Sequence, residues 1–261
     1  ESYLIMGLLD RSRDAFHDAL RVLGRPRPSS SLATVWALMG DVLRQITHLP
    51  RRLVPVGSLD SDATVGWRVA VRCQAILAEA LYYQTDLAGW FATNLAAINL
   101  AERNLDPGPA GRAYAGLGNL FGTARLHWLA RRYFDAAYAS PDPLAISSVH
   151  WSEAVYHLGY GRWQRAHTVL DGGLVWTRER GDHSEGGVGL TVRGYCQLIA
   201  GSMPDAIDTF TEVLRSSQEH GMAQQELWAL TLIAPALNAA GRADAAWSHL
   251  DAAGQRLDLA D

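Results

Sequence analysis

Nine histidines raise the question of a metal site, and the densest group of ligand-type side chains is His150, Glu153 and His157. These three positions share one face of a helix, so two of them can approach a single ion. The chain contains neither a His-Glu-x-x-His motif nor the Glu-x-x-His pair of di-iron helices. His157 also occupies a repeat position at which other helices carry Tyr83 or Phe121. We therefore expect these histidines to pack, and we expect no metal.

The run Gly186-Gly187-Val188-Gly189 opens a predicted helix, where exposed backbone N–H groups can receive an anion. No strand pattern precedes this run and no lysine follows it, because all 23 basic residues of the chain are arginine. A P-loop needs a lysine for the phosphates, and a Schiff base needs a lysine amine, so both are excluded. We expect a loop and a helix start here, and no cofactor.

The candidate nucleophiles are equally isolated. Cys73 and Cys196 lie far apart in helical patterns, and the helical register brings no histidine near either thiol. Buried, reduced thiols are the expected reading, rather than a disulfide framework or a metal knuckle. No Gly-x-Ser-x-Gly motif occurs. Any two carboxylates of a groove can meet in space, but the spacing singles out no pair, so we expect no catalytic residue.

Composition limits the classes of partner. The 261 residues are 48% hydrophobic and 19% charged, which is ordinary globular composition, and the formal net charge is −4. Such a balance gives no reason to expect a nucleic-acid or anionic-membrane partner. No apolar run reaches the ~18 residues of a membrane span, and the start Glu1-Ser2-Tyr3-Leu4 lacks the pattern of a signal peptide. We expect a cytoplasmic piece of a longer protein.

The elements that would position any site form an internal repeat. Gly161, Gly201 and Gly241 follow one another at 40-residue spacing, and the pattern extends upstream to Arg125 and Leu87 at spacings of 36 and 38. Small residues recur five positions after and seven before these anchors, and the ninth position after is bulky in four of five units. The three rows are Ala92, Ala130, Ala166, Ala206 and Ala246; Ala80, Gly118, Ala154, Gly194 and Ala234; and Ala96, Phe134, Leu170, Phe210 and Leu250. Small residues at helix crossings and a glycine between helices predict stacked helical hairpins.

The chain is therefore predicted to be all-α. The expected architecture is a right-handed α-solenoid of about six tetratricopeptide (TPR)-like helix pairs with repeats of 36–40 residues. We expect helices at 8–23, 32–49, 63–84, 87–104, 109–123, 126–139, 143–159, 163–180, 185–200, 204–220, 223–240 and 243–257. Residues 1–62 should form irregular N-terminal helices, a truncated first unit plus an insertion, and residues 63–261 one continuous regular array. Pro235 lies inside a predicted helix and should bend it near Ile233.

Three phrases carry a resemblance to a known type of region: DALRVLGRP at 18–26, EALYYQTD at 79–86 and AINLAER at 97–103. The chain from about Ala15 to Leu257 resembles the TPR-like helical region of large bacterial multidomain regulators. It is most similar to the segment that follows the ATPase module in ATPase-coupled class III adenylate/guanylate cyclases. The resemblance implies a scaffold or sensor segment in signal transduction that relays binding to an attached output domain. The ATPase and cyclase modules themselves lie outside these residues, so no activity is implied here.

In TPR-like arrays the first helix of each pair lines a concave face that binds a peptide or a neighbouring domain. The repeat register places on that face Leu77, Leu81, Ala115, Asn119, Trp151, Val155, Thr191, Tyr195, Thr231 and Pro235. Trp151 and Tyr195 are the strongest candidate anchors, since amphipathic aromatic side chains dominate interfaces, although both could instead fill the groove as core. The sequence thus predicts a non-catalytic protein-interaction segment. A helical domain that uses the same groove to bind or convert a small molecule, and a self-association module, remain as alternatives.

Overall fold

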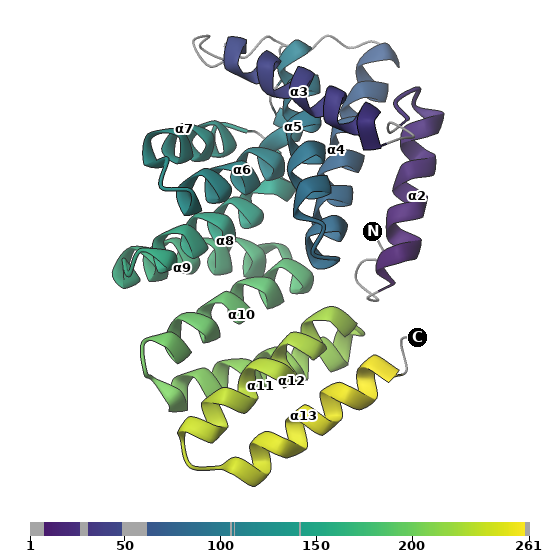
Figure 1. Cartoon of the computed structure of the whole chain (residues 1–261). Coiled ribbons are helices and arrows are strands. Elements are labelled where there is room, and N and C mark those ends of the chain that lie inside the picture. Colours follow the sequence, from purple (N-terminus) through teal and green to yellow (C-terminus); the bar gives the residue numbers. More distant parts are fainter. Residues whose placement is uncertain are drawn as a thin grey trace. The chain divides into compact units, whose positions relative to one another are not determined.

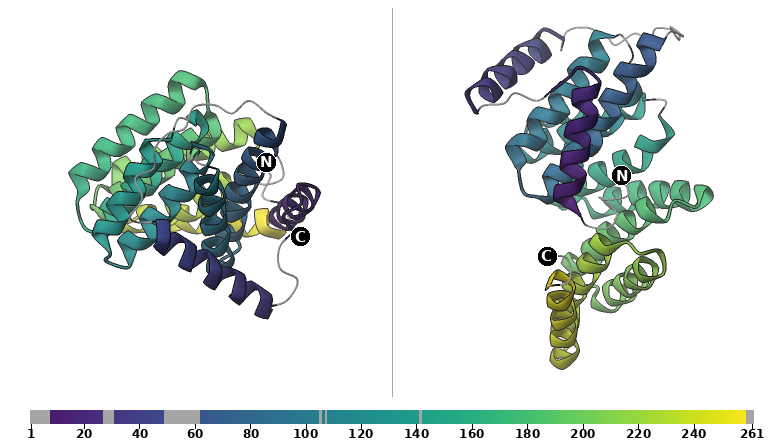
Figure 2. Two further views of the ribbon diagram at one scale, coloured as in Figure 1. Left: turned by 90° about the horizontal axis from the view of Figure 1, so that it is seen from above. Right: turned by 90° about the vertical axis from the view of Figure 1, so that its right-hand side faces the viewer.

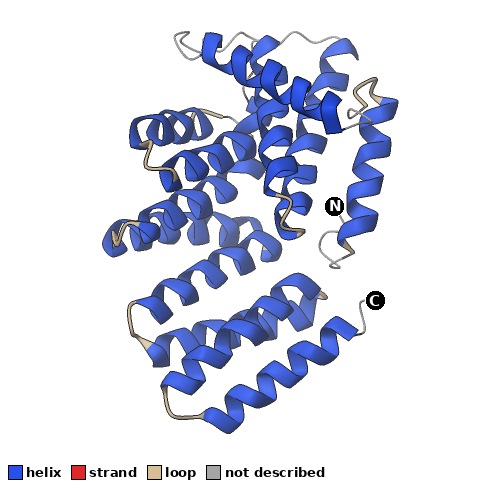
Figure 3. Cartoon of the chain, viewed as in Figure 1, coloured by secondary structure: helices blue, strands red, loops and turns tan. Residues whose placement is uncertain are grey.

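The computed structural model describes residues 8–26, 31–48, 62–104, 106, 108–140 and 142–258. Within these ranges the chain is all α-helical, with twelve α-helices and one short 3-10 helix and no strand (Figures 1 and 3). The helices are α2 (Leu9–Val22), α3 (Ser31–His48), α4 (Asp62–Tyr83), α5 (Leu87–Arg103), η1 (Gly108–Ala110), α6 (Gly111–Thr123), α7 (His127–Tyr138), α8 (Pro143–Gly159), α9 (Trp163–Arg180), α10 (His183–Ile199), α11 (Met203–His220), α12 (Ala223–Ala239) and α13 (Ala243–Asp258). Each predicted helix lies within two residues of an observed one.

The described chain divides into two compact units, residues 9–149 and 150–258, with the boundary inside α8. In the first unit α4 packs on α5 and α6 packs on α7, while α2 packs on α4 and α3 packs on α5. Leu77, Ile98, Tyr114 and Leu117 are fully buried at its centre. Figure 2 shows α3 at the edge of this unit in both views.

In the second unit consecutive helices pack on one another from α9 to α13, and α10 also packs on α12. Trp151, Leu170 and Cys196 belong to one buried cluster, and Phe210 and Leu237 belong to another. Sequential pairwise packing of this kind confirms the predicted all-α repeat architecture. The predicted division of the chain at residue 62 stays a prediction.

The turns between helices share one backbone geometry. Eight of the described residues have a left-handed φ, between +61° and +85°. The amide of the residue after each donates to the carbonyl five positions earlier, as in the bond from Arg162 to His157 at 3.0 Å. This arrangement is the Schellman motif, which ends a helix and turns the chain in two residues. The eight residues are Gly24, Thr85, Arg125, Gly161, Gly181, Gly201, Gly221 and Gly241.

One predicted anchor of the repeat is wrong. Leu87 is the first residue of α5, and the left-handed position of that turn belongs to Thr85, with φ 61°. Arg125 was placed correctly, with φ 62°. The anchors therefore follow at spacings of 40, 36, 40 and 40, and the register of the first regular pair shifts by two residues.

Small and large residues are matched across the helix pairs. A Cβ added to Gly118 would lie 3.1 Å from the Phe134 ring, and one added to Gly194 would lie 2.7 Å from the Phe210 ring. In the pair between these two, formed by α8 and α9, the same two positions are Ala154 and Leu170, both buried in one cluster. A larger side chain on one helix thus accompanies a smaller one on its neighbour, so that the crossing stays closely packed.

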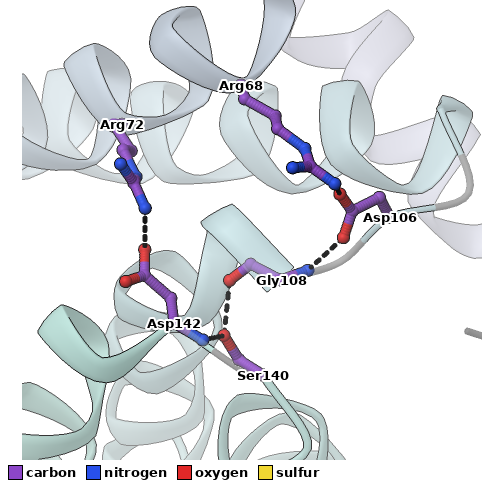
Figure 4. Close-up of polar contacts among 6 residues, drawn as sticks. All are labelled: Arg68, Arg72, Asp106, Gly108, Ser140 and Asp142. Atoms are coloured by element: carbon purple, nitrogen blue, oxygen red, sulfur yellow. Dashed lines mark hydrogen bonds and ion pairs between the residues drawn. The ribbon is translucent and has the colours of Figure 1, made fainter. Parts of the chain in front are cut away.

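A chain of polar contacts fixes the connections around α4 in the first unit (Figure 4). Arg68 pairs with Asp106 at 2.5 Å, and Asp106 accepts a hydrogen bond from the Gly108 amide at 3.1 Å. The hydroxyl of Ser140 donates to the Gly108 carbonyl and accepts from the Asp142 amide. Asp142 in turn pairs with Arg72 at 3.2 Å. The two arginines of α4 therefore hold the loops that lead into η1 and α8.

α12 continues as a helix through Pro235, so the segment is not a loop. Proline donates no backbone hydrogen bond, and the Thr231 carbonyl thereby loses its helical donor. The Thr231 hydroxyl donates to the carbonyls of Leu227 and Trp228, at 2.9 and 3.0 Å. The predicted bend near Ile233 stays a prediction.

Candidate functional site

The predicted partner face divides by repeat position. The five repeats are numbered from their left-handed anchors Thr85, Arg125, Gly161, Gly201 and Gly241. The sixth residue before the anchor is not buried in any of the five repeats, whereas the tenth is buried in four of them. The sixth positions are Glu79, Asn119, Val155, Tyr195 and Pro235, and the tenth are Ala75, Ala115, Trp151, Thr191 and Thr231. Val155 and Tyr195 are 38% and 43% exposed. The binding role of the accessible residues Asn119, Val155, Tyr195 and Thr231 stays a prediction.

Five residues expected on the partner face are buried: Leu77, Leu81, Ala115, Trp151 and Thr191. The two leucines were misplaced because the register of their unit is shifted by two residues, so the exposed row there passes through Glu79. Glu79 is itself paired, since it accepts from Arg112 at 3.0 Å and from the Tyr83 hydroxyl at 2.9 Å. None of the five buried residues offers a side chain to a partner in this structure.

Trp151 is a core residue of the second unit. Its indole N–H donates to Glu185 at 3.0 Å. The ring lies so close to α9 and α10 that a Cβ added to Gly173 or to Gly189 would meet it at 2.5 or 2.4 Å. The glycine-rich run of α10 is thereby explained by helix packing: Gly189 admits this ring, and Gly187 admits the side chain of Gln225.

The histidine group of α8 likewise packs. His157 lies 3.2 Å from Glu153, and burial lowers the pKa of the His157 imidazole even though this carboxylate opposes the shift. His150 packs against Gly172. No group of three or more metal-ligating side chains occurs among the described residues. Cys73 is half-buried and Cys196 is buried, where burial raises the pKa of the Cys196 thiol to about 11.

A row of exposed apolar side chains lies on α3, a helix that the repeat register places in an irregular insertion. Leu32, Trp36, Met39, Leu43 and Ile46 of α3 are 69, 64, 49, 62 and 56% exposed. Val35 beside them is also exposed. We call these six residues the α3 face. Apart from Val35, the residues of the α3 face follow one another at steps of four, three, four and three residues, a pattern that is visible in the sequence. The repeat register does not include this helix, so the pattern was not used to predict a partner face.

The opposite side of α3 is held by buried polar contacts. Gln45, the one buried residue among those described in α3, donates to Glu102 at 3.3 Å, and Glu102 also accepts from the Tyr114 hydroxyl at 3.0 Å. The Asn99 amide donates to the Asp41 carbonyl at 3.0 Å and to its carboxylate at 3.1 Å. Burial and the neighbouring Glu102 raise the pKa of Tyr114 well above its usual value, so the phenol stays a donor.

A cavity of about 380 Å³ lies between α2, α3, α4 and α5 in the first unit. Its lining includes Ala92, which had been expected at a close helix crossing, and Ala96. Three arginines also line it, namely Arg25, Arg44 and Arg103.

The comparisons with family models and with curated proteins identify no family for this chain. No family model matches the sequence, and no curated protein matches it. Among the helices that the structure describes, none is both long and apolar enough to cross a membrane. A functional proposal for this chain therefore rests on its fold and its exposed surfaces.

Proposed function

We propose that this chain is a non-catalytic, TPR-like interaction segment of a larger cytoplasmic bacterial regulator, and that the α3 face joins two copies of it. One observation carries the proposal: six large apolar side chains stand exposed together on a helix whose other side is anchored by polar contacts. A helix on the surface of a monomer ordinarily turns its apolar residues inward. An exposed apolar patch of this kind marks an interaction site.

The spacing of the α3 face favours another helix as its partner. Alternating steps of four and three residues place Leu32, Trp36, Met39, Leu43 and Ile46 along one seam, as in helices that pair by knobs-into-holes packing. The positions that flank this seam carry Ala33, Val35, Gly40, Val42 and Thr47. They hold no charge to repel an identical helix, and the small residues among them let two backbones approach.

A second copy is the occupant that this chemistry fits, because the face is complementary to itself. A two-fold axis through Met39 sets Trp36 against Leu43 of the second copy, and Leu32 against Ile46 of the second copy. Antiparallel helix dipoles favour this orientation.

The area is sufficient for a weak dimer. Side chains of this type, half to two thirds exposed, can each bury on the order of 100 Å². Six of them give roughly 600 Å² per copy and about 1,200 Å² for the pair, at the lower end of specific interfaces. A dissociation constant in the micromolar range is therefore expected.

Sedimentation equilibrium of the full chain tests the proposal. The unsubstituted chain should show a concentration-dependent dimer, and Trp36→Glu with Leu43→Glu should weaken it at least tenfold. The matched control is Trp128→Glu with Val175→Glu, which changes two apolar residues on α7 and α9 that are 66% and 48% exposed. A chain that stays monomeric up to ~100 μM, or a dimer that the α3 variant leaves intact, would contradict the proposal.

A further inference from the structure

The cavity between α2, α3, α4 and α5 contains polar atoms that lack partners. Asn99 is 1% exposed and lines the cavity, and its amide nitrogen is committed to Asp41. Those two donations fix the orientation of the amide. Its carbonyl oxygen Oδ1 is buried and accepts no hydrogen bond. Gln74 also lines the cavity, and its Oε1 is likewise buried without a donor.

Buried carbonyl oxygens are ordinarily paired, and each one left unpaired costs free energy. Two such acceptors on residues that line one cavity favour an occupant that brings hydrogen-bond donors. Neither oxygen has a donor among the described residues, so a donor would have to come from outside them.

The charge around the cavity is positive. Arg25, Arg44 and Arg103 line it, and Asp41 is the one acid among the described lining residues. Arg44 lies 3.6 Å from Asp41, whereas no described ion pair involves Arg25 or Arg103. Burial raises the pKa of the Asp41 carboxyl, although Asn99 and Arg44 oppose the shift. Arginine binds carboxylates and phosphates through paired donors.

Apart from Thr34 and Thr93, the rest of the lining is apolar. Leu20, Leu77 and Leu100 contribute to it, together with Ala92 and Ala96. A volume of about 380 Å³ suits a small organic molecule. A second cavity of about 750 Å³ shares Pro26, Thr34, Leu38 and Ala92 with it, so the space continues along α3.

We propose that this cavity binds a small organic anion, a carboxylate or a phosphate ester with a compact apolar body and at least one hydroxyl or amino donor. The anionic group pairs with Arg25 and Arg103 at the exposed end. The donor reaches Asn99 Oδ1 or Gln74 Oε1 inside, and the apolar body lies on the leucines between them. The inference is independent of the proposed pairing of two copies, since none of the α3 residues that line the cavity of about 380 Å³ belongs to the α3 face.

Matched small probes separate the three features of this ligand. 4-Hydroxyphenylacetate carries the ring, the carboxylate and one donor; phenylacetate lacks the donor, and 4-hydroxyphenylacetamide lacks the charge. Binding to the full chain is followed by NMR, using the side-chain amide and guanidinium signals. For ligands of this size we expect millimolar dissociation constants for the first probe. The amide should bind at least tenfold more weakly, and phenylacetate several-fold more weakly.

Two variants locate the binding. Arg25→Gln with Arg103→Gln should remove the tenfold preference for the anion, whereas Arg215→Gln on α11 should leave it intact. Gln74→Leu should reduce the preference for the hydroxyl without lowering the melting temperature, because it removes an unpaired buried acceptor. 4-Hydroxybenzylphosphonate, compared with the carboxylate, shows which anion class the arginines prefer.

Three results would overturn the proposal: no anionic probe binding at 10 mM, equal binding of the anion and its amide, or binding that the double arginine variant leaves unchanged. The first would mean that only water occupies the cavity. The oligomeric state of the chain does not enter any of these measurements, so failure here and failure of the dimer proposal are distinguishable.

Discussion

The Phe210 ring packs directly on Gly194, at the crossing of α10 and α11, where a Cβ on the glycine would lie 2.7 Å from the ring. The same two repeat positions are glycine and phenylalanine at Gly118 and Phe134, but alanine and leucine at Ala154 and Leu170. One crossing geometry therefore accepts either of two volume-matched pairs. A pair that combines alanine with phenylalanine, or glycine with leucine, should lower the free energy of unfolding.

We expect Gly194→Ala to lower the free energy of unfolding by about 1–3 kcal/mol, because the added methyl overpacks the crossing. Phe210→Leu alone should cost about 1 kcal/mol through lost volume. The double variant restores the alanine–leucine pair of the α8–α9 crossing, so its loss should be smaller than the sum of the two single losses. Denaturant titration of all four chains measures this coupling. Strictly additive losses would show that the two positions do not compensate.

Gly189 and Gly186 offer a second comparison within one helix. A Cβ on Gly189 would lie 2.4 Å from the Trp151 ring, whereas one on Gly186 would meet only Thr177, at an ordinary 3.5 Å. Gly189→Ala should therefore destabilise the chain by about 1–3 kcal/mol. Gly186→Ala should be neutral or stabilise it by up to about 1 kcal/mol, since alanine favours the helix. Thermal and denaturant unfolding test both, and equal effects would contradict the close packing of Trp151.

The helices were predicted well because residues close to each helix end in the sequence determine where the helix stops. Gly161, Gly201 and Gly241 stand where the backbone is left-handed, and glycine adopts that conformation at no steric cost. Gly181 and Gly221 continue the spacing at 20 residues and were overlooked, although the signal was present. The register failed at Thr85 because a threonine holds the glycine conformation there, and no local rule identifies it.

The surfaces were harder to predict than the helices, since they depend on which faces meet. The sequence left Trp151 either as a partner anchor or as a core residue. It is a core residue, because Gly173 and Gly189, on two other helices, make room for its ring. The cavity beside Asn99 arises from four helices, one of which lies outside the repeat register. Periodicity places a residue on a face of its helix, whereas the burial of that face is decided by residues distant in sequence.

Among the described residues, Thr85 and Arg125 are left-handed without being glycine, and Arg125 leads to a third prediction. Arg125 has φ 62°, a conformation that costs an ordinary L-residue about 1 kcal/mol or more. Arg125→Gly should relieve that cost and raise the free energy of unfolding by up to about 1 kcal/mol. The control, Arg131→Gly within α7, should lower it by about 1 kcal/mol. Losses in both variants would mean that the Arg125 side chain stabilises its turn by more than the backbone strain.

The fourth prediction concerns pH. Burial lowers the pKa of His157 below its usual value, Glu153 opposes this, and Arg162 and Arg165 add to it. Its Nδ1 is buried without a partner, so a proton there would be poorly solvated. The folded chain thus binds this proton less readily than the unfolded chain. The contribution to stability is present above the unfolded pKa of about 6.5 and is lost as the pH falls through the folded value.

Urea titrations between pH 7.5 and 5 should therefore show a stability decrease that is shallower in His157→Gln. His249→Gln, the matched control, should keep the slope of the unsubstituted chain. An unchanged slope in the His157 variant would assign the pH dependence to other groups.

The last prediction fixes the orientation of the proposed pair of α3 helices. Antiparallel pairing about Met39 brings Trp36 of one copy against Leu43 of the other, whereas parallel pairing brings each residue against itself. In a background with Cys73→Ser and Cys196→Ala, one chain carries Trp36→Cys and another carries Leu43→Cys. Mixing the two under mild oxidation should give a covalent heterodimer in excess over both homodimers, because a disulfide requires the Cα atoms to lie within about 7 Å. A chain with Thr47→Cys, beside the seam, serves as the control for random collision. Homodimers of the Trp36→Cys chain in excess would establish parallel pairing, and covalent products no more abundant than those of the control would refute pairing through the α3 face.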